Sequence, residues 1–388
     1  MRVIFTFAGG LGHFEPLVPF ASAVAAAGHT VAFAAGPGRR ASIEAAGFTA
    51  FPVGNSIAVR ERRPLLVPDR DREDHDLREG FVRRNGARRL PLYLALFDQW
   101  RPDVVVCEEL DFGSMLAAEK LGLPYANEQV IASGSFVRPA VIGPALADLR
   151  AEHGLPPDPD LVMLHRNLMI SPFPPSFRDP AVPLPDTAFP IRPPLGPRTR
   201  SERPTVYFTL GTVYDTESGD LFARVLAGLR DLPVDVVATV GLHIDPAEFG
   251  PQRAGIHISR FVPQADVLPR CDLVISHGGS GSVIGALAHG LPTVLLPMGA
   301  DQPHNAEQCV RLGAGRELHP VTVTPDDVRT TVAEVLADPS YRRAAEGVRA
   351  EILDLPEPAC AVPLLELLVT SPAQQTAHAS ALAEHGRQ

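Results

Sequence analysis

The sequence is short of positive charge and of long apolar runs, and each shortage excludes a class of protein. Lysine and arginine number 35 against 45 acidic residues, which leaves a formal net charge of −10. Nucleic-acid binding depends on basic side chains that neutralise phosphates, so no nucleic-acid partner is expected. No apolar run approaches the roughly 20 residues of a membrane-spanning helix, and no signal peptide precedes the strand-like residues 3–7. We therefore expect a cytoplasmic protein that has no membrane partner.

Cysteine is also scarce and scattered along the chain. Cys107, Cys271, Cys309 and Cys360 are far apart and form no CxxC or Cys/His cluster. This spacing argues against a zinc site or a disulfide framework and predicts reduced, buried thiols.

The length and the periodicity of the chain predict two α/β domains. A chain of 388 residues exceeds the roughly 250–300 residues that one hydrophobic core serves. Short β-branched runs alternate with alanine-rich helical patterns in both halves, as in parallel α/β domains. We expect strands at 3–7, 30–34, 103–107, 205–210, 234–239, 273–276 and 293–296, and helices at 17–27, 39–46, 112–121, 220–229, 282–289, 305–312 and 325–337.

Proline-rich and irregular stretches mark the domain boundaries. Proline crowds residues 170–204, where a continuous helix or a central strand is disfavoured. We expect an N-terminal domain at 1–190, a linker at 191–203, a C-terminal domain at 204–370 and a polar tail at 371–388 that is disordered. Residues 60–89, dense in arginine and acid, and residues 130–159, rich in glycine, proline and alanine, break the rhythm. Both are expected to form substrate-specific loops, although a solvated charged surface also explains the first.

A glycine-rich turn in the second half combines features of a phosphate site and a sugar site. His277-Gly278-Gly279-Ser280-Gly281-Ser282 lies between two predicted buried strands and precedes a predicted helix. The amides of 279–282 would then point out of a helix N-terminus, where anions bind favourably. Asp301-Gln302, about twenty residues later, adds polar groups that suit sugar hydroxyls. The combination predicts a site for a nucleotide-diphosphate sugar.

A second turn, Gly9-Gly10-Leu11-Gly12-His13, follows the first predicted strand and opens a helix. Open α/β sheets bind ligands at the carboxyl ends of their strands, and imidazole suits general-base catalysis. A histidine that only caps the helix is the alternative interpretation. Glu108, Glu109 and Asp111 follow the strand at 103–107, and a carboxylate there would orient the imidazole. Spacing alone does not choose among these three acids.

Together these motifs resemble glycosyltransferase family 1, and within it the actinobacterial-type enzymes that glycosylate natural products. The resemblance spans nearly the whole chain. Its signature, in order, is Phe261-Val262-Pro263-Gln264, then the 277–282 turn, then Leu287-Ala288-His289-Gly290-Leu291-Pro292, then Asp301-Gln302-Pro303-His304-Asn305-Ala306. It implies an α/β GT-B fold, in which two Rossmann-like parallel domains face one another across a cleft. The first domain would bind the acceptor, and the second would bind the donor.

Carried over residue by residue, the resemblance implies a donor site in the second domain. His277 would contact the pyrophosphate, assisted by the loop residues Gly278, Gly279, Ser280 and Gly281 and by the Ser282 hydroxyl. Asp301 and Gln302 would hold sugar hydroxyls; Phe261, Val262 and Gln264 would meet the base; and Thr209, Gly211 and Thr212 would lie near the phosphates and the cleft.

In the first domain, His13 matches the catalytic base of the family. Glu108 stands where the family has a supporting aspartate and is one methylene longer, so Asp111 is the reserve candidate. Gly285 stands where plant relatives carry a glutamate for the ribose hydroxyls, and Phe261 where many relatives have tryptophan. Losing that glutamate removes a reason to prefer uridine. The donor is therefore expected to be a TDP-sugar, with a UDP-sugar as the other candidate.

The resulting hypothesis is a single inverting displacement, in which His13 takes a proton from an acceptor hydroxyl. No metal or other cofactor is expected, because His277 and a helix N-terminus would stabilise the leaving diphosphate. The acceptor would be a small lipophilic or aromatic natural product. Its pocket would include Gly12, Leu65, Leu66, Phe81 and Phe136, each of which also fits a core position.

Two other functions are compatible with the same motifs. One is a sugar-nucleotide 2-epimerase of the same architecture. The other is a non-catalytic auxiliary protein of a partner glycosyltransferase. The sequence leaves the acceptor's identity and the oligomeric state open, a homodimer included.

Overall fold

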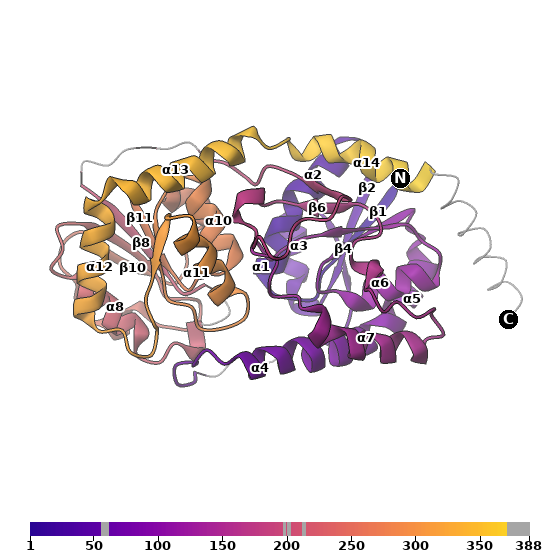
Figure 1. The fold of residues 1–388 in the computed structure, drawn as a ribbon, viewed down its shortest axis with the longest axis horizontal. Helices are drawn as coiled ribbons and strands as arrows, with labels where there is room; N and C mark the ends of the chain where they lie inside the picture. The colour runs from indigo at the N-terminus through magenta and orange to yellow at the C-terminus, as the bar shows by residue number, and fades with distance from the viewer. Residues whose placement is uncertain (56–61, 197–198, 200–202, 212–214, 371–388) are drawn as a thin grey trace, which may run out of the picture.

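The computed structural model describes residues 1–55, 62–196, 199, 203–211 and 215–370. They form two α/β domains that lie side by side (Figure 1), each built on a parallel sheet. Thr212 and the predicted tail at 371–388 lie outside the described residues.

The first sheet has seven strands in the order β3-β2-β1-β4-β5-β6-β7. Their bounds are β1 (Arg2–Thr6), β2 (Thr30–Ala35), β3 (Thr49–Pro52), β4 (Val104–Glu108), β5 (Tyr125–Glu128), β6 (Met169–Ser171) and β7 (Ala188–Pro190). All pairs are parallel, and Phe5 of β1 pairs with Phe33 of β2 on one side and Val106 of β4 on the other. Strands buried on both faces read as continuous apolar runs, which is why β1 and β4 are recognisable from sequence.

The second sheet has six parallel strands in the order β10-β9-β8-β11-β12-β13. Their bounds are β8 (Thr205–Thr209), β9 (Asp235–Thr239), β10 (Ile256–Ser259), β11 (Leu273–Ser276), β12 (Thr293–Leu295) and β13 (Gly315–Glu317). The strands predicted in both halves are present within a residue or two. The strands that the sequence did not predict are all short, with three or four residues each: β3, β5, β6, β7, β10 and β13.

Helices cover both sheets. Their bounds are α1 (Leu11–Phe14), α2 (Val18–Ala26), α3 (Arg40–Ala45), α4 (Arg70–His75), α5 (Ala87–Trp100), α6 (Phe112–Lys120), α7 (Pro139–Glu152), α8 (Leu221–Leu229), α9 (Gln264–Val267), α10 (Ser280–Ala288), α11 (Gln302–Arg311), α12 (Pro325–Ala337), α13 (Pro339–Asp354) and α14 (Val362–Thr370). The helices expected from alanine-rich periodicity are all found, although several begin or end a few residues from the expected position.

The two stretches expected to be loops each contain long helical segments, so the loop prediction is wrong for residues 70–89 and 139–152, whereas residues 130–138 and 153–159 contain no helix. From Arg70 the charged stretch runs through α4, a π-helix at Asp76–Gly86 and into α5. Leu77, Val82 and Leu90 are fully buried there, whereas most of the arginines and acids are at least partly exposed, Glu73 and Arg89 being the buried exceptions. In the 130–159 stretch, α7 buries Ile142, Ala145, Leu146 and Leu149. Buried side chains at helical spacing outweigh the unfavourable composition in both cases.

The last helix, α14, belongs to the first domain. The expected domain boundary at 370 assigns it to the second domain, so that assignment is wrong. α13 leads from the second domain toward the first, and α14 lies over the first (Figure 1). Val362 and Leu365 of α14 join the first domain's core cluster, and Glu366 accepts from Nε2 of His29 at 2.9 Å. The chain therefore crosses between the domains again after the second domain is complete.

Three cysteines are buried as expected, but Cys360 is exposed, which corrects the prediction for that thiol. Cys360 lies in the short turn that precedes α14. The buried residues at this point of the chain are its neighbours Ala361 and Val362. Among the described helices, none is both long and apolar enough to cross a membrane.

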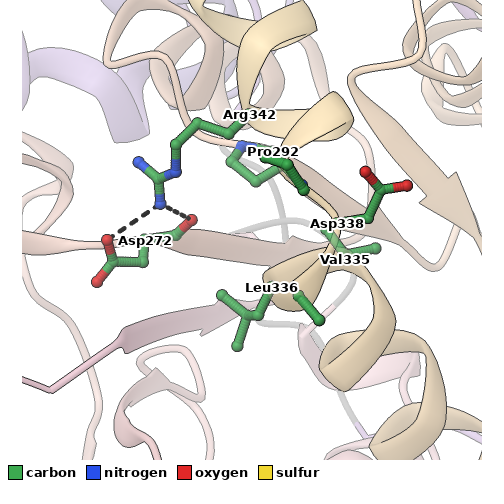
Figure 2. A pocket seen from close by; sticks show the side chains of 8 residues that line it. Asp272, Pro292, Val335, Leu336, Asp338 and Arg342 are labelled. Carbon is green, nitrogen blue, oxygen red and sulfur yellow. Dashed lines mark hydrogen bonds and ion pairs between the residues drawn. The ribbon is translucent and has the colours of Figure 1, made fainter.

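A small hollow of about 120 Å³ lies at the amino-terminal edge of the second sheet, where Asp272 precedes β11 and Pro292 precedes β12. Figure 2 shows Arg342 of α13 turned toward Asp272, and its Nη2 donates to the Asp272 carbonyl and to Oδ1, both at 3.0 Å. This hollow lies at the opposite end of the strands from the 277–282 turn, so it is not the site that the motifs predict.

Docking of α14 is testable with two leucines of the same helix. Leu365 is fully buried, whereas Leu367 is 61% exposed. Leu365→Ala should lower the free energy of unfolding by about 2–5 kcal/mol, since it leaves a cavity in the first domain's core. Leu367→Ala should change it by less than about 0.5 kcal/mol. Urea denaturation measures both, and equal effects would show that α14 is not docked as described.

Candidate active site

His13 and Glu108 meet at the carboxyl edge of the first sheet. His13 lies in α1, directly after β1, and Glu108 is the last residue of the adjacent strand β4. Nδ1 of His13 lies 3.1 Å from Oε1 of Glu108; the carboxylate is fully buried and the imidazole is 23% exposed. The amides of Ala8 and Leu110 donate to Glu108 at 3.2 and 2.9 Å and hold it in place. The extra methylene of glutamate therefore does not prevent the contact.

Two neighbours restrict the His13 ring. A Cβ on Gly9 would lie 2.1 Å from Cδ2 of His13, so no side chain other than hydrogen fits under the ring. Phe81, from the π-helix, stacks with the imidazole, with ring centroids 6.2 Å apart and an interplanar angle of 22°. Neither contact was foreseen, since no local pattern links Gly9 or Phe81 to His13.

Asp111, the reserve partner for His13, belongs to a different network. Its Oδ2 accepts from the Tyr93 hydroxyl at 2.5 Å and from Nη1 of Arg89 at 3.2 Å. Arg89 also donates to the carbonyls of Phe7 and Val53. Arg89 thereby ties α5 to the loops after β1 and β3. Because Asp111 is bound to Arg89 and Tyr93, Glu108 is the carboxylate beside His13.

Burial shifts the pKa values of titratable groups at this edge. Burial raises the pKa of Glu109 to about 7, despite hydrogen bonds from the amides of Val130 and Ile131. Burial also raises the pKa of Glu128 well above its usual range. Burial alone would lower the pKa of His13, but the contact with Glu108, helped by Asp301 and Glu109, outweighs it and the pKa is raised. The imidazolium at His13 is therefore favoured by its neighbours.

His277 follows β11 in the second domain and is packed between two glycines. A Cβ on Gly211 would lie 2.7 Å from Nε2 of His277, and a Cβ on Gly279 would lie 2.5 Å from it. Burial lowers the pKa of His277 to about 4, against an opposing effect of Asp301. His277 is thus a neutral imidazole, and its Nδ1 has no partner among the described residues.

Gln264 and Leu268 border the space that Gly285 leaves. Nε2 of Gln264 donates to the Ser282 hydroxyl at 3.1 Å, and a Cβ on Gly285 would lie 3.0 Å from Oε1 of Gln264. Phe261, three residues earlier, is 53% exposed, and Val262 is half-buried against the neighbouring core. An amide and an open aromatic face therefore stand side by side after β10.

Asp301 sits at the N-terminus of α11 and reaches the N-terminus of α10. Its Oδ2 accepts from the amide and the hydroxyl of Ser280, at 3.2 and 2.6 Å, and from Nδ2 of Asn305 at 2.8 Å. Gln302 is buried, and its Oε1 accepts from the Met298 amide at 2.8 Å. Ser280 is thus committed to Asp301 rather than free for a phosphate, which differs from the role that the resemblance implied.

Of the other predicted donor residues, Thr209 and Gly211 lie at the end of β8 beside His277. The Gly211 amide donates to the Thr209 hydroxyl at 3.2 Å, and Gly211 adopts a φ of 74° that favours glycine. Gly278 and Gly281 lie in the turn and in the first turn of α10.

The predicted acceptor residues do not form one group. Leu65 and Leu66 pack against the core of the second domain, and the Leu66 amide donates to the Glu217 carbonyl at 2.8 Å. They therefore link the domains rather than line a first-domain pocket. Phe136 is buried in the first domain's core. Gly12, with open space around it, and Phe81 are the two that stay next to His13.

The two halves of the site face each other across the domain contact. The amides of Ala132 and Ser133, after β5, donate to Ser280 Oγ at 2.9 Å and to Asn305 Oδ1 at 3.2 Å. Ala300 of the second domain packs against the first domain's core, and the charge of Asp301 acts on His13. Within the described residues, no cluster of three or more His, Cys, Asp or Glu side chains could hold a metal ion.

Known proteins are similar to this chain in sequence and in architecture. Two family models match it, the N-terminal and C-terminal domains of erythromycin biosynthesis protein CIII-like proteins, over residues 22–178 and 223–368. Tylactone mycaminosyltransferase of Streptomyces fradiae is 31% identical, over 95% of this chain and 92% of its own. TDP-daunosamine transferase DnrS of Streptomyces peucetius is 30% identical, over 95% and 97%.

Solved structures agree. The glycosyltransferase VinC in complex with DTDP has 25% identity and a TM-score of 0.76, over 95% of this chain and 100% of its own. The spinosyn forosaminyltransferase SpnP has 28% identity and a TM-score of 0.75, over 96% and 100%. The expected GT-B fold is therefore confirmed.

These relatives are named as sugar transferases, which decides against the 2-epimerase and the auxiliary protein as alternatives. The chain belongs to the erythromycin biosynthesis protein CIII-like family and is a glycosyltransferase of the actinobacterial natural-product type.

Proposed function

We propose that this glycosyltransferase moves a deoxysugar from a TDP-sugar to a hydroxyl group of a small natural-product aglycone, with inversion and with His13 as the general base. The observation that carries the proposal is the contact between His13 and Glu108, 3.1 Å long, at the sheet edge that faces Asp301. A buried carboxylate accepts but does not donate. Nδ1 of His13 is then the protonated nitrogen, and Nε2 is left to receive a proton from the acceptor.

The proton transfer and the bond exchange balance in one step. The acceptor oxygen loses its proton to Nε2 of His13 and attacks the anomeric carbon, and the bond to the diphosphate oxygen breaks on the opposite face. Glu108 compensates the imidazolium that forms, as a carboxylate does in a hydrolase triad. Attack from the face opposite the leaving group inverts the anomeric centre, and the product's anomeric configuration by NMR tests this.

The leaving diphosphate would be stabilised by fixed donors. His277 is a neutral imidazole, so it offers one N–H rather than a positive charge. The first amides of α10, beside Gly279, add the favourable end of a helix dipole. Donors that are already in place cost no reorganisation when charge develops, and no divalent ion is needed in this scheme.

Two features favour a thymidine donor. One relative is named for its TDP-sugar, and another binds DTDP in its structure. In this chain the position of the plant glutamate is Gly285, and Gln264 covers it while donating to Ser282. A carboxylate that accepts from both ribose hydroxyls is thus replaced by an amide. A deoxyribose, which has only one of those hydroxyls, loses little from the change.

The acceptor would enter on the first-domain side of the cleft. Phe81 stacks beside His13, and Gly12 leaves open space next to it. An apolar aglycone would pack on the Phe81 face while presenting one hydroxyl to Nε2. One relative is named as a tylactone mycaminosyltransferase and another as a TDP-daunosamine transferase.

The role of His13 predicts a pH profile. His13→Ala should lower kcat about 10²–10⁴-fold, the usual contribution of a general base. The base must be neutral, and Glu108 holds the pKa of His13 above its usual value, so kcat/KM should rise with pH through that raised pKa. Glu108→Gln removes the raising contribution. The acid limb of the kcat/KM profile of this variant should therefore move to lower pH, and its kcat should fall. A limb that stays in place would contradict the pairing.

Nucleotide recognition is tested by a melting panel with TDP, UDP and GDP. The ligand that binds best raises the melting temperature most, because stabilisation follows RT ln(1 + [L]/Kd), about 2.7 kcal/mol at 100 Kd. We expect TDP to give the largest shift and His277→Ala to abolish most of it. A larger shift with UDP would reject the thymidine preference, and no shift with any diphosphate would reject the donor site.

Stabilisation of the leaving group without a metal predicts full turnover in excess EDTA. Purified enzyme should retain its rate after chelation, and added Mg²⁺ should not increase it more than about twofold. Loss of turnover in EDTA that Mg²⁺ restores would show that a divalent ion neutralises the diphosphate.

A further inference from the structure

The side chain of Asn305 makes several hydrogen bonds on the donor side, and none of the roles described above accounts for them. It lies in the first turns of α11 and is fully buried. Its Nδ2 donates to the Gly278 carbonyl, the Ser280 hydroxyl and Oδ2 of Asp301, at 2.9, 3.0 and 2.8 Å. Its Oδ1 accepts from the Ser133 amide of the first domain at 3.2 Å. One amide thus joins the phosphate turn, the sugar-site acid and the other domain.

Ser280 forms a second path between the same partners. The Ala132 amide donates to its Oγ at 2.9 Å, and the Ser280 hydroxyl donates to Oδ2 of Asp301 at 2.6 Å. Ala132, Ser133 and Ser280 are all buried. Water is therefore excluded from both paths, and each group depends on its protein partner.

We propose that Asn305 and Ser280 are positioning residues that make the orientation of Asp301 depend on contact with the 132–133 segment of the first domain. The proposal rests on the proposed function, in which Asp301 holds hydroxyls of the donor sugar. Three hydrogen bonds all go to Oδ2 of Asp301, while Oδ1 takes none from the described residues. The network therefore leaves Oδ1 as the oxygen for the sugar.

The physical reason is the cost of unpaired buried groups. If the 132–133 segment moves away, Ser280 Oγ and Asn305 Oδ1 each lose a hydrogen-bond donor. An unpaired buried acceptor costs free energy, which favours a new orientation with another donor. The hydroxyl and the amide then reorient, and Oδ2 of Asp301 loses fixed partners. Domain contact thereby aligns the acid that holds the sugar, whereas the bond from Asn305 to the phosphate turn goes to the Gly278 carbonyl and not to the phosphate donors at His277 and Gly279. Sugar binding should be affected and diphosphate binding should not.

The test separates the sugar from the nucleotide. In Asn305→Ala and in Ser280→Ala, the Kd of the nucleoside diphosphate that stabilises the wild type most should change less than about threefold, while kcat/KM for the nucleotide sugar should fall roughly 10- to 100-fold. An equal loss of diphosphate affinity would overturn the proposal, because it would mean that Asn305 only holds the phosphate turn.

A control variant removes a domain contact that does not involve Asp301. Nη2 of Arg311, at the end of α11, donates to the Ser176 carbonyl of the first domain at 2.5 Å. Arg311→Ala should leave kcat/KM within about threefold of the wild type. If it lowers kcat/KM as much as Asn305→Ala does, general domain docking rather than the Asp301 network is responsible.

A double-mutant cycle tests whether Asn305 acts through Asp301. In an Asp301→Asn background, adding Asn305→Ala should lower kcat/KM by less than about threefold, because the residue it positions is already changed. Full additivity would overturn the proposal. If Asn305→Ala melts below the assay temperature, Asn305→Asp serves instead, since it keeps the acceptor for Ser133 but loses the donor to Asp301. Wild-type enzyme that binds no nucleoside diphosphate would instead contradict the proposed function itself.

Discussion

Every candidate side chain depends on one constraint: in a parallel sheet all strands end at the same edge. His13 and Glu108 follow neighbouring strands of the first sheet, and Gly211, His277 and Asp301 follow neighbouring strands of the second. Residues about a hundred positions apart in sequence therefore become neighbours. The contacts of Ala132 and Ser133 with α10 and α11 then bring the two edges together, which places the proposed base opposite the proposed donor site.

Close packing against glycine gives both imidazoles their orientation. Gly9 lies under His13, and Gly211 and Gly279 enclose His277. The surroundings then set different charges. Glu108 stabilises the imidazolium at His13, whereas burial without a close carboxylate keeps His277 neutral. One imidazole is thereby suited to take up a proton and the other to donate a hydrogen bond, although the two side chains are chemically identical.

Sequence reasoning worked where the signal was local. Buried parallel strands such as β1 and β4, and the glycine turns after β1 and β11, were located correctly because apolar runs and glycine spacing are properties of short segments. It failed for residues 70–89 and 139–152, the helical parts of the two irregular stretches. Charge and proline suggested loops there, but buried residues such as Leu77 and Ile142 at helical spacing form helices against the core. It also failed for α14, since nothing in that segment says which domain its apolar face will cover.

The sequence by itself determined the fold class, the order of the motifs and the residue types at the site, because strand patterns, turn glycines and motif spacing are encoded within a few positions. Only the tertiary structure decided which carboxylate meets His13, that Asp111 is committed to Arg89 and Tyr93, and that Leu65 and Leu66 pack on the second domain. The hydrogen bonds on which the proposed role of Asn305 rests are also visible only in the tertiary structure. Such pairings depend on distances between strands and between domains, which spacing along the chain does not contain.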